Sequence, residues 1–149
     1  MMSTKFVTLK LGIKKNIIDG LLIHIPFGSK TAMIATRNKF AASPVIISRE
    51  NIKSETIKYI FINSGNANAC TGKEGHMNTK KILNILSKKL NCSSDQILIM
   101  STGIIGRQLP IKKIIASITN SDLNIYSSIK KAASAIMTTD KFPKYLCET

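Results

Sequence analysis

Short apolar runs alternate with polar, turn-forming residues along the first part of the chain. The strand-like runs cover residues 5–13, 21–25, 31–36, 45–47 and 59–62. Asp19-Gly20 supplies turn chemistry before the second run, and Pro44 precedes the fourth. Because short apolar runs bounded by turn residues are typical of β-structure, we expect each of these runs to form a strand.

A helical period follows the last of these runs. Residues 79–90 carry lysines on one side and apolar side chains on the other, at Ile82, Leu83, Ile85, Leu86 and Leu90. Residues 96–100 then form another predicted strand, which ends at Ser101-Thr102-Gly103. This alternation of strands and helices indicates a protein of the α/β class.

Two more helices are predicted in the last third of the chain. Pro110 suits the first turn of a helix, because the N–H that proline lacks would have no helical partner there. A further helix is expected over residues 123–135, with Ser121-Asp122 as its candidate cap. The pattern contains no internal repeat and no linker, so we expect residues 1–149 to form one domain.

The strong positive charge changes this picture little. The formal net charge is +14, but 19 of the 22 basic residues are lysines, scattered singly or in pairs. Arginine, which recognises phosphate through two hydrogen bonds, occurs only at Arg37, Arg49 and Arg107. Tryptophan is absent and aromatic residues make up 5% of the chain, so no base-stacking surface is indicated. We therefore expect solvated lysines and no nucleic-acid partner.

The cysteines, histidines and hydropathy favour a reducing, aqueous compartment. Cys70, Cys92 and Cys147 form no CxxC pair, and His24 and His76 lack ligand-like spacing to them, so we expect no metal site. His24 lies within an apolar run and is expected to be structural. No run reaches the ~18 apolar residues of a membrane-spanning helix, and no secretory signal is evident at the N-terminus. We expect a cytoplasmic protein with no membrane segment.

Two loops carry small or hydroxyl-bearing residues suited to a binding site. Residues 63–72 (NSGNANACTG) have only small side chains, so their backbone can approach a partner closely, although the residues by themselves favour a tight structural turn. Their glycine spacing does not match a Walker A phosphate loop. In residues 101–110 (STGIIGRQLP), the Thr102 hydroxyl and the Gly103 amide can direct two donors at one developing oxyanion.

A third loop, residues 135–140 (AIMTTD), follows the last predicted helix. Thr138, Thr139 and Asp140 can hydrogen-bond the amine or amide of a substrate. The same residues can also serve only to end the helix, with Pro143 preventing its continuation.

Together these segments resemble the ornithine/glutamate N-acetyltransferase family of arginine biosynthesis. The resemblance rests on TRNK at 36–39, SPV at 43–45, and then NSGNANACTG, STGIIGRQLP and AIMTTDKFPK in this order. It extends to GIK at 12–14 and DGLLI at 19–23, and so spans almost the whole chain. It implies a layered sandwich of mixed and antiparallel sheets with flanking helices, of which residues 1–149 would be an incomplete, alpha-chain-like part.

The resemblance also implies an acyltransferase that moves an acetyl group from N-acetylornithine to glutamate. Members of the family cleave themselves before a threonine, which becomes the nucleophile of a ping-pong cycle, and some also use acetyl-CoA. Thr102 and Gly103 match the catalytic oxyanion pair. Thr139 matches a substrate-contacting threonine, with Thr138 as the alternative if the register differs by one. No metal or tightly bound cofactor is implied.

The nucleophilic threonine of the family would follow Thr139 at some distance, and Thr149 does not match it. We therefore expect a beta-chain-like partner that carries this threonine, assembly into a hetero-oligomer, and no turnover by this chain alone. One alternative is an inactive remnant of a broken reading frame. Another, in a different class, is a basic RNA-binding module.

Overall fold

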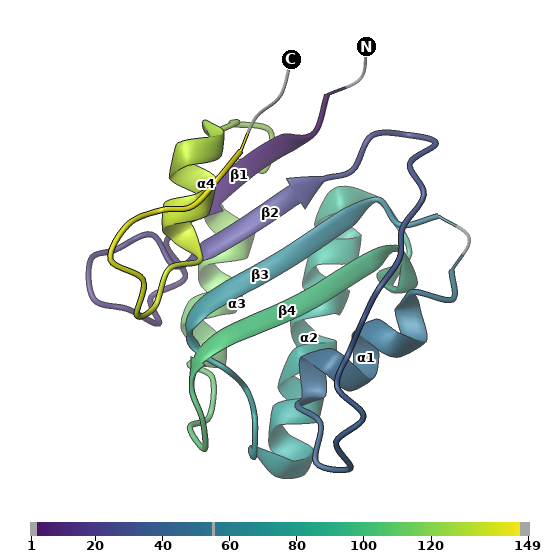
Figure 1. Ribbon diagram of the computed structural model, residues 1–149, viewed down its shortest axis with the longest axis vertical. Helices are drawn as coiled ribbons and strands as arrows, with labels where there is room; N and C mark the ends of the chain where they lie inside the picture. The colour runs from purple at the N-terminus through teal and green to yellow at the C-terminus, as the bar shows by residue number, and fades with distance from the viewer. Residues whose placement is uncertain (1–2, 55, 147–149) are drawn as a thin grey trace.

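The computed structural model describes residues 3–54 and 56–146, which are built around one mixed four-stranded sheet (Figure 1). The strands lie across the sheet in the order β1 (Lys5–Leu9), β2 (Gly20–His24), β3 (Tyr59–Asn66) and β4 (Ile97–Ile104). The first three are successively antiparallel, whereas β3 and β4 are parallel. The expectations stated above for Cys147 and Thr149 concern residues that lie outside the described ranges.

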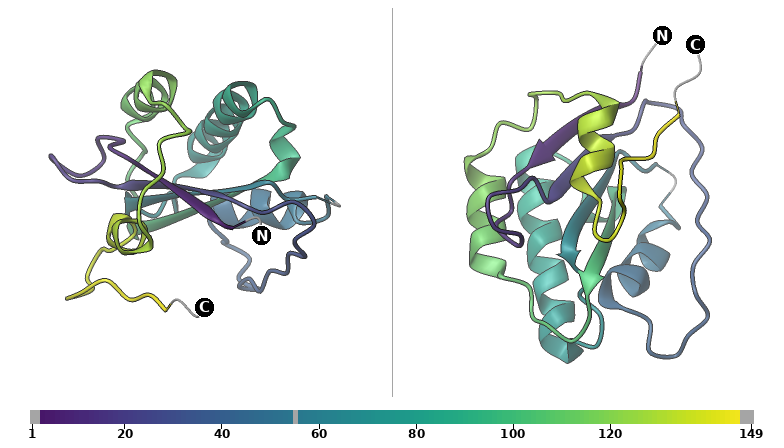
Figure 2. Two further views of the ribbon diagram at one scale, coloured as in Figure 1. Left: turned by 90° about the horizontal axis from the view of Figure 1, so that it is seen from above. Right: turned by 60° about the vertical axis from the view of Figure 1, so that its left-hand side comes forward.

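Helices flank the sheet on both faces (Figure 2). One face is covered by α2 (Gly72–Leu90) and α3 (Ile111–Asn120). On the other side, α4 (Ile129–Ala135) packs on β1 and β2, and α1 (Ser43–Asn51) packs along β4. A short 3-10 helix, η1 (Ser94–Gln96), leads into β4. This arrangement confirms the α/β class and the expectation of helices flanking a mixed sheet.

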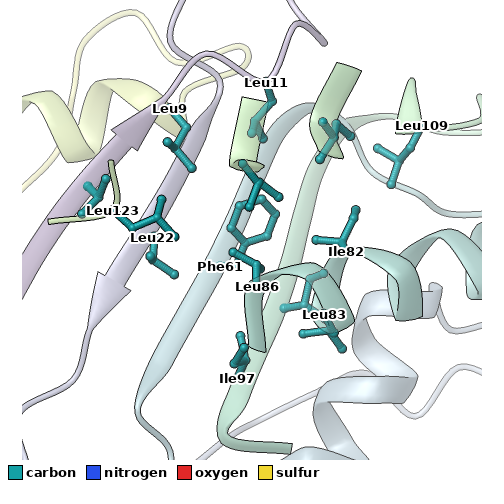
Figure 3. Close-up of a cluster of buried hydrophobic side chains, with 14 of the residues drawn as sticks. Leu9, Leu11, Leu22, Phe61, Ile82, Leu83, Leu86, Ile97, Leu109 and Leu123 are labelled. Carbon is teal, nitrogen blue, oxygen red and sulfur yellow. The ribbon is translucent and has the colours of Figure 1, made fainter. Parts of the chain in front are cut away.

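The main core lies between the sheet and the two helices α2 and α3 (Figure 3). Amphipathic α2 turns Ile82 and Leu86 toward the sheet, where both belong to one buried cluster with Phe61 of β3. From α3, Ile114 and Ile118 enter the same cluster and are fully buried. Each such side chain stabilises the fold by about 1.5–3 kcal/mol when removed from water, so this core fixes β3 and β4 firmly in place.

The strand predicted at residues 45–47 is wrong, because these residues belong to helix α1. Pro44 lies in the first turn of that helix, where proline is tolerated. The buried side of α1 includes Ser48, whose hydroxyl donates to the Ile99 carbonyl at 2.7 Å and accepts from the Ile99 amide at 2.9 Å. The helix thereby occupies the edge of β4 that a further strand would otherwise occupy.

Other predicted boundaries also change. Residues 31–36 form no strand, and most of their side chains are exposed. The first strand ends at Leu9 instead of residue 13, because the following loop folds back onto Asp19. The last helix begins after Ser128, whose hydroxyl accepts a hydrogen bond from the Lys131 amide at 3.3 Å. Ser121-Asp122 is therefore not its cap.

Candidate active site

The C-terminal ends of strands β3 and β4 lie side by side at one end of the sheet (Figure 1). In their parallel register Ser64 lies opposite Thr102, and Gly65 lies opposite Gly103. The carboxyl ends of parallel strands are a common location for binding sites, because loops diverge there and leave backbone groups accessible. Both predicted oxyanion residues lie at these strand ends, with Thr102 half-buried and Gly103 exposed.

A pair of glycines allows the two strands to meet this closely. Gly65 and Gly103 both have positive φ angles, of 96° and 129°. A Cβ atom on Gly103 would clash with the carbonyl carbon of Gly65. Glycine at position 103 is therefore required by both its backbone conformation and its neighbour.

A pocket of about 500 Å³ opens at these strand ends. Its lining consists of Lys14, Gly65, Thr102, Gly103, Ile104, Thr138 and Thr139. Four of these residues are the ones predicted from the sequence as the oxyanion pair and the substrate contacts. They come from β4 and from the segment after α4, and the fold brings them together. Because Thr138 and Thr139 both line the pocket, both remain candidates for the substrate contact.

The segment that carries the two threonines is attached to the strand ends by hydrogen bonds. The Ser64 hydroxyl donates to the Ala135 carbonyl at 2.6 Å, at the end of α4. The Lys14 ammonium donates to the Met137 carbonyl at 3.0 Å. With only seven residues, α4 is too short to be stable by itself, so these contacts contribute directly to the placement of Thr138.

Residues 63–72 form a hydrogen-bonded support for the site. The Asn66 amide group donates to the carbonyls of Arg107 and Gln108, at 3.1 and 3.3 Å, and so ties β3 to the loop after β4. The buried Asn68 side chain donates to the Gly75 carbonyl at 3.2 Å and to the Thr79 hydroxyl at 2.8 Å. These bonds secure the first turns of α2, which begins at Gly72 and not at the predicted residue 79.

Asn63 fixes the register of the two strands just before the site. Its side-chain oxygen accepts from the Ser101 hydroxyl at 2.6 Å, and its amide nitrogen donates to the Asn66 carbonyl at 2.8 Å. The side chain is fully buried, so these partners compensate for the hydrogen bonds it loses to water. Asn63 thus acts on the site through the backbone and not by lining the pocket.

Asp140 takes part in a local ion pair outside the pocket lining. Its carboxylate lies 2.7 Å from the Lys144 ammonium, on an exposed surface. The hydrogen bond and the charge of Lys144 lower the pKa of Asp140 below its usual value. An exposed pair of this kind contributes little to stability, and Asp140 is not among the residues that line the pocket.

His24 lies at the opposite end of the sheet from these residues. Its ring packs edge-on against Tyr59 and Tyr126, with centroids 5.0 and 5.4 Å away. Burial lowers the pKa of His24, and the nearby charge of Lys5 acts in the same direction. A neighbouring pocket of about 360 Å³ is separate from the predicted site residues. The edge-on aromatic packing agrees with the structural role expected for His24, whereas its buried Nε2 atom has no hydrogen-bond partner in the described part of the chain.

The described part of the chain contains neither a cluster of potential metal ligands nor a helix able to span a membrane. Residues 3–54 and 56–146 contain no cluster of three or more His, Cys, Asp or Glu side chains that could hold a metal ion. None of the helices in these two ranges has the length and apolar character needed to cross a membrane.

Comparisons with known proteins identify the family of this chain and agree with its fold. The model of the ArgJ family matches residues 5–149, and the chain belongs to this family. It is 44% identical over 141 residues to the mitochondrial arginine biosynthesis bifunctional protein ArgJ of Dictyostelium discoideum, covering 92% of this chain and 32% of that protein. It is 45% identical over 133 residues to arginine biosynthesis bifunctional protein ArgJ 2 of Clostridium acetobutylicum, covering 88% and 34%. The chain thus spans about a third of the length of these relatives.

Two solved structures have a fold similar to that of this chain. A crystal structure of ornithine acetyltransferase in complex with ornithine, from Mycobacterium tuberculosis, superposes with a TM-score of 0.83 at 28% identity. The match covers 93% of this chain and 77% of that one. The arginine biosynthesis bifunctional protein ArgJ from Bacillus halodurans also gives a TM-score of 0.83, at 27% identity, and covers 93% and 73%.

Proposed function

We propose that this chain forms the oxyanion-binding and substrate-contacting side of an ornithine/glutamate N-acetyltransferase of arginine biosynthesis. The observation that carries the proposal is the meeting of Thr102-Gly103 and Thr138-Thr139 in one pocket, although they belong to different elements. Membership of the ArgJ family supports the reaction class. The ornithine complex of the structurally similar acetyltransferase supports an amino-acid substrate.

In the proposed reaction, a threonine hydroxyl attacks the acetyl carbonyl of N-acetylornithine and gives its proton to a base. The tetrahedral intermediate carries a negative oxygen, which the Thr102 hydroxyl and the Gly103 amide would stabilise by about 3 kcal/mol each. Collapse of the intermediate returns a proton to the departing amine of ornithine and leaves an acetyl-enzyme. The amine of glutamate then attacks the acetyl-enzyme, so that the threonine hydroxyl is regenerated.

Thr139, with Thr138 as the alternative, is proposed to contact the amino-acid part of the substrate. Both side chains are exposed in the pocket and carry a hydroxyl that can donate to a carbonyl or accept from an amine. No metal and no tightly bound cofactor takes part in the proposed reaction. Acetyl-CoA is a candidate second acetyl donor, and the cytoplasm is the proposed compartment.

The nucleophilic threonine is proposed to come from a beta-chain-like partner in a hetero-oligomer. Several large apolar side chains are more than half exposed, namely Phe27, Ile34, Phe40, Ile104, Ile105, Phe142 and Leu146. These side chains would be removed from water wherever another protein segment covered them. Ile104 also lines the pocket, so the proposed partner would meet this chain at the site itself.

The proposal is tested by co-expressing this chain with an ArgJ-family chain that carries the nucleophilic threonine. Acetyl transfer from N-acetylornithine to glutamate is expected from the pair and not from the 149-residue chain alone. Thr102→Ala should lower kcat by roughly a hundredfold or more, because it removes one oxyanion donor. Thr119→Ala, at an exposed position of α3, is the matched control and should leave kcat unchanged.

Two results would contradict the proposal. The first is transfer by the pair that Thr102→Ala does not slow, since the oxyanion assignment would then be wrong. The second is a folded, assembled pair that transfers no acetyl group, which would favour the inactive-remnant alternative.

A further inference from the structure

Lys14 reaches from the loop between β1 and β2 to the segment that presents Thr138 and Thr139. Its ammonium donates a 3.0 Å hydrogen bond to the Met137 carbonyl, directly before the two threonines. Lys14 also lines the pocket, where it is the only charged side chain among the described residues. One lysine therefore links the pocket lining to the backbone that positions the substrate-contacting hydroxyls.

The backbone of Lys14 is itself held rigidly. Asp19 is fully buried, and its carboxylate accepts hydrogen bonds from the amides of Leu11, Ile13 and Lys14. The bonds from Ile13 and Lys14 measure 2.7 and 2.8 Å. The Asp19 carbonyl accepts from the Ser64 amide at 2.8 Å, which attaches this loop to β3. A buried carboxylate needs such donors, and here they define where the lysine side chain starts.

The path of the lysine side chain depends on a glycine. A Cβ atom at position 65 would lie 2.8 Å from Cγ of Lys14 and 3.1 Å from Cγ2 of Ile13. The aliphatic part of Lys14 therefore crosses over Gly65, which lies opposite Gly103 in the sheet. Because position 65 has no side chain, the aliphatic part of Lys14 can pass over it and the ammonium can reach the Met137 carbonyl.

We propose that Lys14 is a positioning residue for acetyl transfer, a role that rests on the proposed function. Its ammonium holds the Met137 carbonyl, and with it Thr138-Thr139, at a fixed place relative to Thr102-Gly103. Because the Lys14 donor is charged, its hydrogen bond to a carbonyl is stronger than one from a neutral donor. Its positive charge is also favourable just beyond the C-terminus of helix α4, where the helix dipole is negative. The substrate would otherwise have to order this segment when it binds.

Two variants separate the donor from the rest of the side chain. Lys14→Met retains an unbranched apolar stem over Gly65 but removes the ammonium, whereas Lys14→Arg retains a charged donor. Lys15→Met is the matched control, because Lys15 is the adjacent lysine and is exposed. Each variant is measured in the co-expressed pair, and its thermal midpoint is recorded first.

Lys14→Met should raise KM for N-acetylornithine about tenfold and lower kcat by a smaller factor. Lys14→Arg should restore most of the wild-type KM, and Lys15→Met should change neither KM nor kcat. The thermal midpoint should stay within about two degrees of the wild-type value. A wild-type KM in Lys14→Met would overturn the proposal. So would a loss that appears only as a lower midpoint or less folded protein, because that is the result of a purely structural role.

A second measurement does not depend on activity. Amide hydrogen exchange at residues 137–139 should become about tenfold faster in Lys14→Met, with the core strand β3 unchanged. Hydrogen exchange can be measured on the co-expressed protein whether or not it transfers acetyl groups. Failure of the proposed function, seen as no transfer by the wild-type pair, is thereby distinguished from failure of the positioning role, seen as unchanged exchange.

Discussion

Gly65 and Gly103 lie opposite each other across the parallel strands β3 and β4, and the backbone of Gly65 fills the space that a side chain at position 103 would need. The two residues also have positive φ angles. The strand ends therefore carry two separate constraints, one on conformation and one on space, at the position assigned to an oxyanion donor.

Gly103→Ala should lower the free energy of unfolding by more than about 2 kcal/mol, because it combines a strained positive φ with a backbone clash. The measurement is chemical denaturation of this chain. Gly106→Ala separates the two causes, since Gly106 has a φ of 78° but no neighbouring atom within 4 Å of the place that a Cβ would take. Gly106→Ala should lower the free energy of unfolding by only about 1 kcal/mol. Equal losses in the two variants would show that the contact with Gly65 is unimportant.

Ser48→Ala should destabilise the chain by about 1–3 kcal/mol, because it leaves the amide and carbonyl of Ile99 without their side-chain partner in a buried place. The free energy of unfolding and amide exchange at Ile99 measure the effect. Ser134→Ala, at an exposed position of α4, is the control and should change stability by less than about 0.5 kcal/mol. An unchanged exchange rate at Ile99 would contradict the sealing of the edge of β4 by α1.

Asn68→Ala should destabilise the chain by about 2 kcal/mol or more, because Asn68 is buried and bonded to both Gly75 and Thr79. Asn124→Ala replaces an exposed asparagine and serves as the comparison. Thermal unfolding gives the stability, and proteolysis within residues 67–75 reports whether the loop has loosened. A stable variant with a protected loop would mean that the backbone alone maintains this segment.

Stability should fall as the pH drops below about 6.5, the ordinary pKa of histidine, because the pKa of His24 is lowered in the folded chain. Burial is the largest cause of the shift. Below that pH the unfolded chain binds a proton that the folded chain does not, so protonation favours unfolding. His24→Gln should reduce this dependence in denaturation curves between about pH 5 and 8. His76→Gln controls for loss of a histidine as such, and an equal reduction in both variants would exclude His24 as the source.

Much of the fold follows from local patterns in the sequence. The apolar runs at residues 21–25, 59–62 and 96–100 are largely strand, and the lysine-faced period at 79–90 lies in α2. The run at 45–47 is the main error, because three apolar residues after a proline are compatible with a strand or with the first turns of a helix. The helix is accompanied by the contact of Ser48 with the edge of β4, which is distant in sequence and cannot be read from the run itself.

The candidate site likewise has a part that the sequence predicts and a part that only the structure shows. The family resemblance carried by the motifs indicates Thr102, Gly103 and Thr139, with Thr138 as the alternative, and all four residues line one pocket in the structure. The sequence assigns no role to Lys14, although GIK at 12–14 forms part of the resemblance. Its contact with Met137 requires Asp19 to fold the loop back and Gly65 to leave space, and neither condition follows from the spacing of residues along the chain.

The two borders of the sheet also limit how the chain can meet other proteins. Along β4 the hydroxyl of Ser48 satisfies the backbone of Ile99, and beside β1 the amide of Ser127 donates to the Phe6 carbonyl at 2.7 Å. At these two positions a neighbouring polypeptide therefore finds no open backbone group at which to add a strand. The proposed partner at the strand-end pocket would instead be recognised by the fit of side chains such as the exposed Ile104, and not by generic β-pairing.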